Sequence, residues 1–402
     1  MFALENLNKK IIKLLGLSFL VIALTFAPIS VNKFNFFAPP SLEVNVNAQT
    51  PISNEGKEAQ SDRAQNSVES KKPSMDITKM VMGALAGLVL FLYGVTRLAQ
   101  GLEAIAGDRI KGILDRFTTN RFAGVLTGAA ATTVLDSSSV TIIIVIAMVS
   151  AELLTFVQSL AVVLGSNIGT TVGAQVIAFD VNQYAPIGLF IGLILHFVGK
   201  TDKWKNIGLI LLGLGLLFFG LDTIDEAMKP LRDYQPFIEW MRTLGQHPLQ
   251  GALVGALFTV LIQSSSATVA IIVTLAGSGL ITLPAGVALM LGAEVGTCAD
   301  TLVATIGRGR AALRTGVFHL LFNVITATIG ILFATQLAGL AQSISGGTGV
   351  GRQIANAQVI FNLLGVALVI GFLPLIARAL QILIPDAKNK NQQAATKPKL
   401  PA

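Results

Sequence analysis

Residues 124–144 read GVLTGAAATTVLDSSSVTIII, and residues 251–271 read GALVGALFTVLIQSSSATVAI. Each stretch places three serines inside an otherwise apolar run. Extending the comparison to 124–171 and 251–298, at a constant offset of 127 and without gaps, gives 17 identities in 48 positions. Within that alignment LGSNIGTT at 164–171 faces LGAEVGTC at 291–298. A repeat of this length predicts two structurally related halves.

The composition indicates a membrane protein. Of 402 residues, 52% are hydrophobic and only 13% are charged, with a mean hydropathy of +0.69; a soluble domain carries about 25% charged residues. Long apolar segments separated by short charged loops are typical of a bundle of membrane helices. We therefore predict an all-α polytopic membrane protein, with apolar segments near 79–99, 122–150, 153–179, 185–199, 206–221, 249–277, 280–306, 311–338 and 353–384.

Several other classes are disfavoured. The single cysteine, Cys298, rules out a disulfide framework and a cysteine zinc site. No P-loop, H-E-x-x-H, G-x-S-x-G or Rossmann fingerprint is present, so we expect neither ATP-driven transport by this chain alone nor an enzyme with catalytic residues. The net charge of +7 sits in a few loops, which favours membrane orientation over nucleic-acid binding.

The chain divides by composition. Residues 1–48 resemble a signal peptide, although an uncleaved anchor fits them nearly as well. Residues 49–78 are polar and of mixed charge, which predicts a disordered linker. We then expect a first membrane repeat over 79–221, an extracytoplasmic connector over 222–248, a second repeat over 249–384 and a basic cytoplasmic tail over 385–402.

Lysine and arginine cluster in four regions, near 103–121, 200–205, 307–314 and the C-terminal tail. The positive-inside rule places all four in the cytoplasm. The threading that satisfies them sends hairpin 122–150 in from the cytoplasm and hairpin 249–277 in from outside. We therefore predict two inverted-topology repeats with re-entrant helical hairpins and broken helices, in a plasma or inner membrane, with the C-terminus cytoplasmic.

The serine triplets lie at the predicted hairpin tips. About 14 apolar residues on each side make roughly 21 Å of helix, too short to cross a bilayer. A helix that starts at Ser139 or Ser266 offers free N–H groups and a positive dipole end to an anion, and the hydroxyls and freed carbonyls offer oxygen ligands to sodium. The alternative is that the serines only hold packed helices together.

The glycine motifs follow each hairpin. Gly165, Gly169 and Thr170 align with Gly292, Gly296 and Thr297, and we expect each set to interrupt its helix at membrane depth, where irregular backbone must line protein or a cavity. Close helix packing is the alternative for such spacing.

Q-S-S-S with a following Thr, twice, each followed by a G-[SA]-N-I-G-T-T motif, resembles the type II sodium/phosphate cotransporters and their bacterial relatives, over residues 79–384. His319–Asn323 (HLLFN) and Gln358–Asn362 (QVIFN) resemble the family's H-x-x-F-N segments. The resemblance implies sodium-driven uptake of inorganic phosphate, with sodium as the co-transported ion and no other metal. It implies a site formed by Ser137, Ser138, Ser139, Gln263, Ser264, Ser265 and Ser266, with Asn167, Thr170 and Thr297 on the sodium side.

Two positions depart from that pattern. Asp136 stands where the family has Gln, and Glu294 where it has Asn. A carboxylate at membrane depth costs about 2.5–3.5 kcal/mol on insertion scales, so both are candidates for sodium binding or coupling. Proton uptake, repulsion of a divalent anion and pairing with a nearby polar group are the alternatives. The departures leave open a symporter of another oxyanion or of a carboxylate, and a non-transporting regulatory or scaffold protein; the sequence does not give the oligomeric state.

Overall fold

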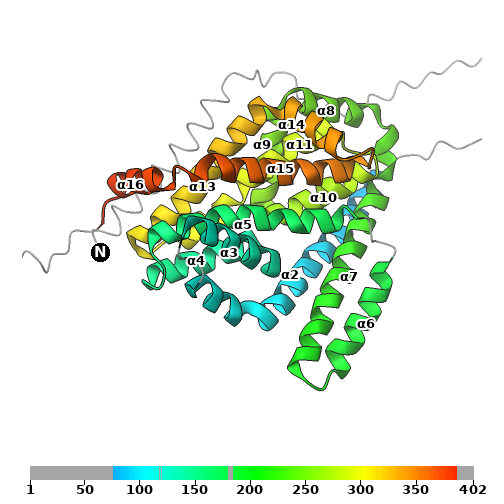
Figure 1. The fold of residues 1–402 in the computed structure, drawn as a ribbon. Coiled ribbons are helices and arrows are strands. Elements are labelled where there is room, and N and C mark those ends of the chain that lie inside the picture. The colour runs from blue at the N-terminus through cyan, green and yellow to red at the C-terminus, as the bar shows by residue number, and fades with distance from the viewer. Residues whose placement is uncertain (1–75, 117, 119, 180–183, 387–402) are drawn as a thin grey trace, which may run out of the picture. The chain divides into compact units, whose positions relative to one another are not determined.

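The computed structural model describes residues 76–116, 118, 120–179 and 184–386 (Figure 1). The expected signal peptide or anchor, nearly all of the expected linker and nearly all of the basic tail lie outside these residues. The first part of the described chain contains α2 (Ile77–Arg116), α3 (Arg121–Leu135), α4 (Ser138–Ser150), α5 (Phe156–Ile177), α6 (Ala185–Val198) and α7 (Asp202–Met228). The 3-10 helix η2 (Lys229–Asp233) and α8 (Gln235–Gln246) connect it to α9 (Pro248–Ile262), α10 (Ser265–Gly277), α11 (Leu283–Gly296), α12 (Cys298–Ala304), α13 (Gly309–Leu332), α14 (Ala334–Ile344), α15 (Val350–Ile370) and α16 (Leu373–Leu383).

The described residues form an all-α membrane bundle, as predicted. Six stretches are long and apolar enough to cross a bilayer. Their burial differs. In Phe156–Ile177 and in Leu283–Ala304, 67% of the apolar 18-residue segment that could cross the bilayer is buried inside the protein, against 22% in Ile77–Ala106. The two stretches that carry the glycine motifs are therefore central, whereas α2 faces mainly outward. The others are Asp202–Asp233, Gly309–Leu332 and Val350–Ile370.

Both predicted hairpins are present, and each is broken at its serine triplet. Helix α3 ends at Leu135 and α4 begins at Ser138, while α9 ends at Ile262 and α10 begins at Ser265. The residue that ends each first helix adopts a left-handed conformation, with φ 51° at Asp136 and 60° at Gln263. A left-handed residue stops an α-helix and turns the chain, so the two breaks have the same backbone cause.

One end of the bundle, here called the basic end, is tied together by side chains from distant segments. The Gln158 amide at the start of α5 donates to the carbonyl of Thr118, 3.3 Å away. Arg121 at the start of α3 donates to the carbonyl of Gly371 at 3.3 Å, and Arg314 near the start of α13 donates to the carbonyl of Ile384 at 2.8 Å. Three of the four basic regions thus lie together.

The opposite end is marked by a polar pocket. Its lining includes Ala178 after α5, Ser278 after α10, and Thr348 and Arg352 at the start of α15. Helix α5 runs from the basic end to this pocket, and its 22 residues measure about 33 Å. Hairpin α3–α4 therefore opens at the basic end and hairpin α9–α10 at the opposite end. The inverted arrangement of the two repeats is confirmed.

The predicted connector over 222–248 is more ordered than a loop. Helix α7 continues to Met228, and η2 and α8 follow. Phe237, Trp240, Met241 and Leu244 recur at helical spacing and contribute to a core cluster that includes residues of α11. An amphipathic helix with one apolar face buries that face rather than remaining irregular. The segments 311–338 and 353–384 also each divide into two helices.

The expectation about the glycine motifs is wrong for the first repeat and right for the second. Helix α5 is continuous through Gly165, Gly169 and Thr170, whereas the second motif ends α11 at Gly296, before α12 starts. A methyl group on Gly165 would overlap the carbonyl oxygen of Val125 in α3, and one on Gly292 would overlap that of Ala252 in α9. The glycines serve close helix packing in both repeats, which was the alternative reading.

Candidate functional site

The first serine of each triplet caps the second helix of its hairpin. The Ser137 hydroxyl accepts a hydrogen bond from the Val140 N–H at 3.2 Å, and the Ser264 hydroxyl accepts one from the Ala267 N–H at 3.2 Å. Each helix therefore begins one residue earlier than predicted. Because a cap satisfies only one of the free N–H groups of a helix start, the first N–H groups of α4 and α10 still point out of the helix. Both helix starts retain the geometry of an anion site.

A threonine pair braces each tip. Thr132 donates to Thr141 at 2.9 Å across the first hairpin, and Thr259 donates to Thr268 at 2.9 Å across the second. All four hydroxyls are buried. Equal distances at an offset of 127 show that the two breaks are the same structure built twice.

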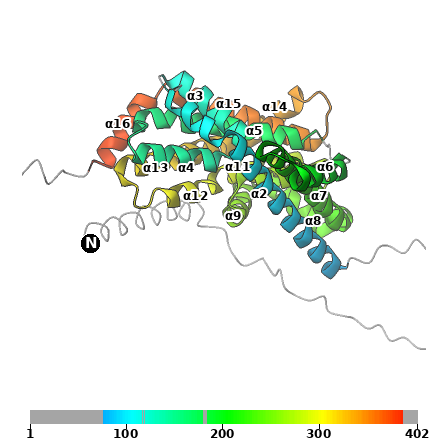
Figure 2. The same cartoon turned by 90° about the horizontal axis from the view of Figure 1, so that it is seen from below.

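The tip of the first repeat reaches the second repeat. The Ser139 hydroxyl lies 3.3 Å from the Thr297 hydroxyl, at the joint between α11 and α12. The carboxylate of Asp300 lies near the same serine. Helix α4 packs against α12 and α13 (Figure 2), and α10 packs against α5 (Figure 1). Each hairpin thus packs against helices of the opposite repeat.

The remaining predicted residues of the serine triplets and their flanks lie at the two helix breaks. Ser138 and Ser265 are buried at equivalent first positions of their helices, and Ser266 is half-buried one residue later. Gln263 is exposed at the second break. Asp136 lies against the backbone of α5 at Gly173. No hydrogen bond within the described residues joins one serine triplet to the other.

Asn167 and Thr170 turn back onto their own helix. The Asn167 amide donates to the carbonyl of Val163 at 2.9 Å, and the Thr170 hydroxyl donates to that of Ser166 at 3.0 Å. Such local bonds satisfy buried polar side chains without a ligand. Their predicted sodium role therefore has no support from a contact outside α5.

Glu294 aligns with Asn167 but has different surroundings. Its side chain is 1% exposed. The Gln358 amide donates to its Oε1 at 2.8 Å, and the Asn362 amide donates to the same oxygen at 3.4 Å. Pairing with nearby polar groups, one of the alternatives for this carboxylate, is what the structure contains. Gln358 and Asn362 were not predicted as site residues, although both lie in a segment that resembles H-x-x-F-N.

Asp300 is a third residue that sequence reasoning did not assign to the site. Its carboxylate accepts from the Thr301 N–H at 2.6 Å and lies near Ser139. Within the described residues, no lysine or arginine forms an ion pair with Asp136, Glu294 or Asp300. Asp136 and Asp300 thus lie next to the serine triplet at the start of α4.

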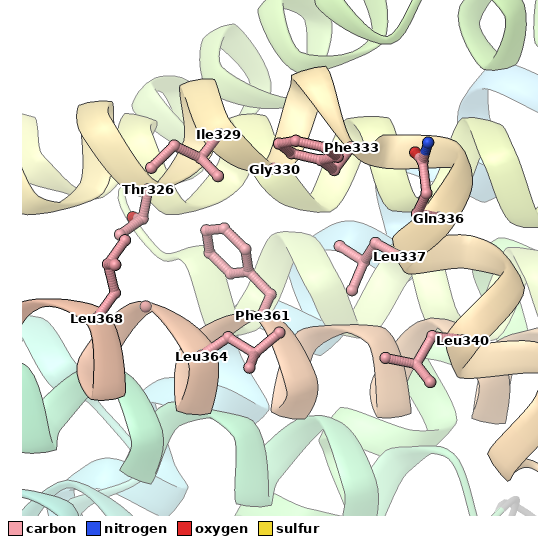
Figure 3. Close-up of a pocket in the computed structure, with 11 residues that line it drawn as sticks. Thr326, Ile329, Gly330, Phe333, Gln336, Leu337, Leu340, Phe361, Leu364 and Leu368 are labelled. Atoms are coloured by element: carbon pink, nitrogen blue, oxygen red, sulfur yellow. The ribbon is translucent and has the colours of Figure 1, made fainter.

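Two pockets lie away from the tips. An apolar groove of about 320 Å³ runs between α13, α14 and α15 (Figure 3). Leu364, Leu368 and Phe333 in its lining are each more than half exposed, as expected for a surface that faces lipid. The polar pocket at the opposite end measures about 770 Å³ and includes Arg232 and Arg352.

A family model described as Na+/Pi-cotransporter matches residues 90–226 and 234–370, once for each half of the bundle. The chain belongs to this family. The double match agrees with the internal repeat and with the pair of serine-capped breaks. The family is one of phosphate transporters, not of enzymes, and the chain is a multi-pass membrane protein.

The relatives differ in what their names say. YqeW of Bacillus subtilis is 29% identical over 307 residues, 76% of this chain and 99% of that protein. An Escherichia coli K12 protein named "Putative inorganic phosphate export protein YjbB" is 26% identical over 313 residues, 78% of this chain and 57% of that protein. Human sodium-dependent phosphate transport protein 2B is 30% identical over 136 residues, 31% of this chain and 20% of that protein. No solved structure matches the chain.

Proposed function

We propose that this protein carries inorganic phosphate inward across the membrane together with sodium, using the interface between its two serine breaks as the site. The observation that carries this proposal is the contact from Ser139 of one repeat to Thr297 of the other. Secondary transporters place their sites where inverted repeats meet, and helix starts there receive the anion.

The carboxylates supply a physical reason why phosphate binding would depend on sodium. Asp136, Glu294 and Asp300 bring negative charge to an interface that must accept phosphate. Like charges at short range in a poorly hydrated site repel strongly. Sodium bound beside these carboxylates removes the repulsion, so the anion binds better to the sodium-loaded protein. Asp136 and Glu294 are the residues we assign to this coupling, with Thr297 at the joint between the repeats.

The arginine and lysine distribution supports an orientation. Three basic regions share the basic end of the bundle, and the positive-inside rule directs such an end to the cytoplasm. Hairpin α3–α4 then opens to the cytoplasm, hairpin α9–α10 opens to the outside, and α16 leads to a cytoplasmic C-terminus. The polar pocket, whose lining holds three acidic and three basic side chains, faces outward in this orientation.

Radiolabelled phosphate flux in proteoliposomes tests the proposal. We expect uptake when sodium is high outside, and little uptake when choline replaces sodium or when the sodium gradient is reversed. Competition by sulfate, arsenate and a dicarboxylate identifies the preferred anion. Flux that is indifferent to sodium removes the coupling claim.

The relative named as a phosphate export protein supplies a second direction. YjbB of Escherichia coli matches 78% of this chain. Loading the vesicles with labelled phosphate and following its exit, with sodium on either side, separates the two directions. Exit that exceeds entry under matched sodium and phosphate gradients would assign export.

A further inference from the structure

Helix α2 carries a positive charge at each border of its apolar segment. Lys79 and Arg97 are 18 positions apart, and the residues between them are all uncharged. Eighteen residues of α-helix measure about 27 Å, close to the roughly 30 Å thickness of the hydrocarbon layer of a bilayer. Since α2 continues into the basic region 103–121, Arg97 marks the border of the apolar layer on the side of the basic end.

The packing of α2 on α7 determines which face of α2 looks outward. A methyl group on Gly94 would come within 2.4 Å of the backbone nitrogen of Leu217, so Gly94 faces α7. Val89 and Tyr93, one helical turn apart on another face, are 66% and 47% exposed. This outward face is therefore apolar at Val89 and becomes polar from Tyr93 onward, as a phospholipid does from its acyl chains to its headgroup.

The Arg97 guanidinium is held on this outward face by two neutral side chains. One of its terminal nitrogens donates to the Tyr93 hydroxyl at 2.5 Å, and the other donates to the side-chain oxygen of Gln100 at 3.0 Å. The guanidinium carbon also lies 4.6 Å from the centre of the Tyr93 ring. These contacts fix the orientation of the guanidinium and use only part of its five N–H donors.

The charge of Arg97 has no counter-ion within the described residues. The ion pairs there include Lys79 with Asp76 at 3.6 Å, at the other border of the same helix, but none with Arg97. Tyr93 and Gln100 are neutral, so they orient the guanidinium without cancelling its charge. A cation beside hydrocarbon is costly unless an anion accompanies it. At the surface of α2, the surrounding lipid is the available source of that anion.

We propose that Tyr93, Arg97 and Gln100 bind the phosphodiester of an anionic phospholipid, with an acyl chain of that lipid lying along the outward face at Val89. A guanidinium pairs with phosphate oxygens through two parallel N–H donors. Tyrosine is enriched at the depth where headgroups begin, because its ring is apolar and its hydroxyl is polar. The three side chains thus match the phosphate, and the face beyond them matches the chain.

The start of α7 favours a lipid with net negative charge. A methyl group on Gly101 of α2 would lie 3.0 Å from the carbonyl oxygen of Asn206, so the first turn of α7 lies beside this end of α2. Lys203 and Lys205 there are exposed, and Trp204 is 50% exposed. Basic side chains at a membrane surface attract anionic lipids, and tryptophan anchors a helix at the interface. Assignment to the cytoplasmic leaflet rests on the proposed orientation, whereas the lipid site does not.

Native mass spectrometry of the purified full chain in mild detergent tests the site. The protein is titrated with phosphatidylglycerol and, separately, with phosphatidylcholine that has the same acyl chains. We expect the wild type to retain phosphatidylglycerol in preference to phosphatidylcholine, with affinity for phosphatidylglycerol about tenfold or more weaker in Arg97→Gln and also weaker in Tyr93→Phe. Lys79→Gln is the matched control: it removes the same charge at the other border, where Asp76 is the partner, and should bind like the wild type.

The same spectra separate the other possible occupants. Addition of inorganic phosphate should leave the bound lipid in place; its displacement would assign Arg97 to free anions and overturn the proposal. A dimeric wild type without bound lipid, and a monomeric Arg97→Gln, would assign this face to a second copy of the chain and would also overturn it. If Arg97→Gln is not recovered as a monodisperse protein, Tyr93→Phe decides the question. Equal phosphatidylglycerol affinity in the variants and the wild type, or equal wild-type affinity for both lipids, contradicts the site.

Discussion

The hydroxyl oxygens of Ser139 and Thr297 lie 3.3 Å apart, although the two residues are 158 positions apart in the chain and belong to different repeats. Ser139 sits in the first turn of α4, and Thr297 sits at the joint between α11 and α12. A helix start in one repeat therefore touches a helix break in the other. Relative motion of the repeats must change this contact, which makes it a sensitive point for transport.

Removing either hydroxyl should impair transport. We expect Ser139→Ala and Thr297→Val each to lower phosphate flux by about 5- to 160-fold, because loss of one hydrogen-bond partner costs roughly 1–3 kcal/mol. The double variant should cost less than the sum of the single variants, since both remove one interaction. Flux in proteoliposomes at fixed sodium measures this. Ser343→Ala, on exposed α14 where the hydroxyl bonds the carbonyl of Gly339, is the control; strict additivity would contradict the contact.

Gln263 allows backbone and side-chain roles to be separated. Its left-handed φ of 60° is unfavourable for a residue with a side chain. Gln263→Gly should therefore raise the thermal midpoint in detergent, by the equivalent of up to about 1 kcal/mol, and still reduce phosphate flux because the amide is lost. Gln263→Ala should reduce flux without the gain in stability. Wild-type flux in both variants would show that Gln263 is only a helix terminator.

The glycine motifs should act through packing. A methyl group on Gly165 would overlap the Val125 carbonyl, so Gly165→Ala should destabilise the protein by about 1–3 kcal/mol. The matched control is Gly339→Ala in α14, where an added methyl group meets nothing within 4 Å; it should be neutral or slightly stabilising. Thermal unfolding in detergent compares the two. Equal midpoints would mean that α3 and α5 are free to separate.

The repeat offset and the serine triplets predicted both hairpins because each triplet is flanked by too few apolar residues for a span. The same reasoning could not find the partners of Glu294, which lie 64 and 68 residues later on another helix. It also predicted that both glycine motifs interrupt their helices, which holds for only one of them. Both copies contain the same glycines, yet only the second helix breaks. There Asp300 bonds the Thr301 N–H and competes with the helix backbone, whereas Gly173 stands at the aligned position of the first repeat.

Asp300 should influence which anion is accepted. Its carboxylate lies near Ser139 at the proposed phosphate site. A carboxylate there accepts a hydrogen bond from a protonated phosphate but repels fully ionised sulfate. Asp300→Asn should therefore increase inhibition of phosphate flux by sulfate. Competition curves at a single pH measure this change. An unaltered sulfate inhibition constant would place Asp300 outside the reach of the anion.

The serine breaks themselves are the core of the account, and phosphate exchange tests them without regard to direction. Proteoliposomes with equal phosphate and sodium on both sides are given ³²P-phosphate outside, and its entry is followed. We expect exchange by the wild type, and entry at the level of protein-free vesicles for Ser138→Ala and Ser265→Ala, both recovered folded. Wild-type exchange rates in the two variants would contradict the claim that these helix breaks carry phosphate.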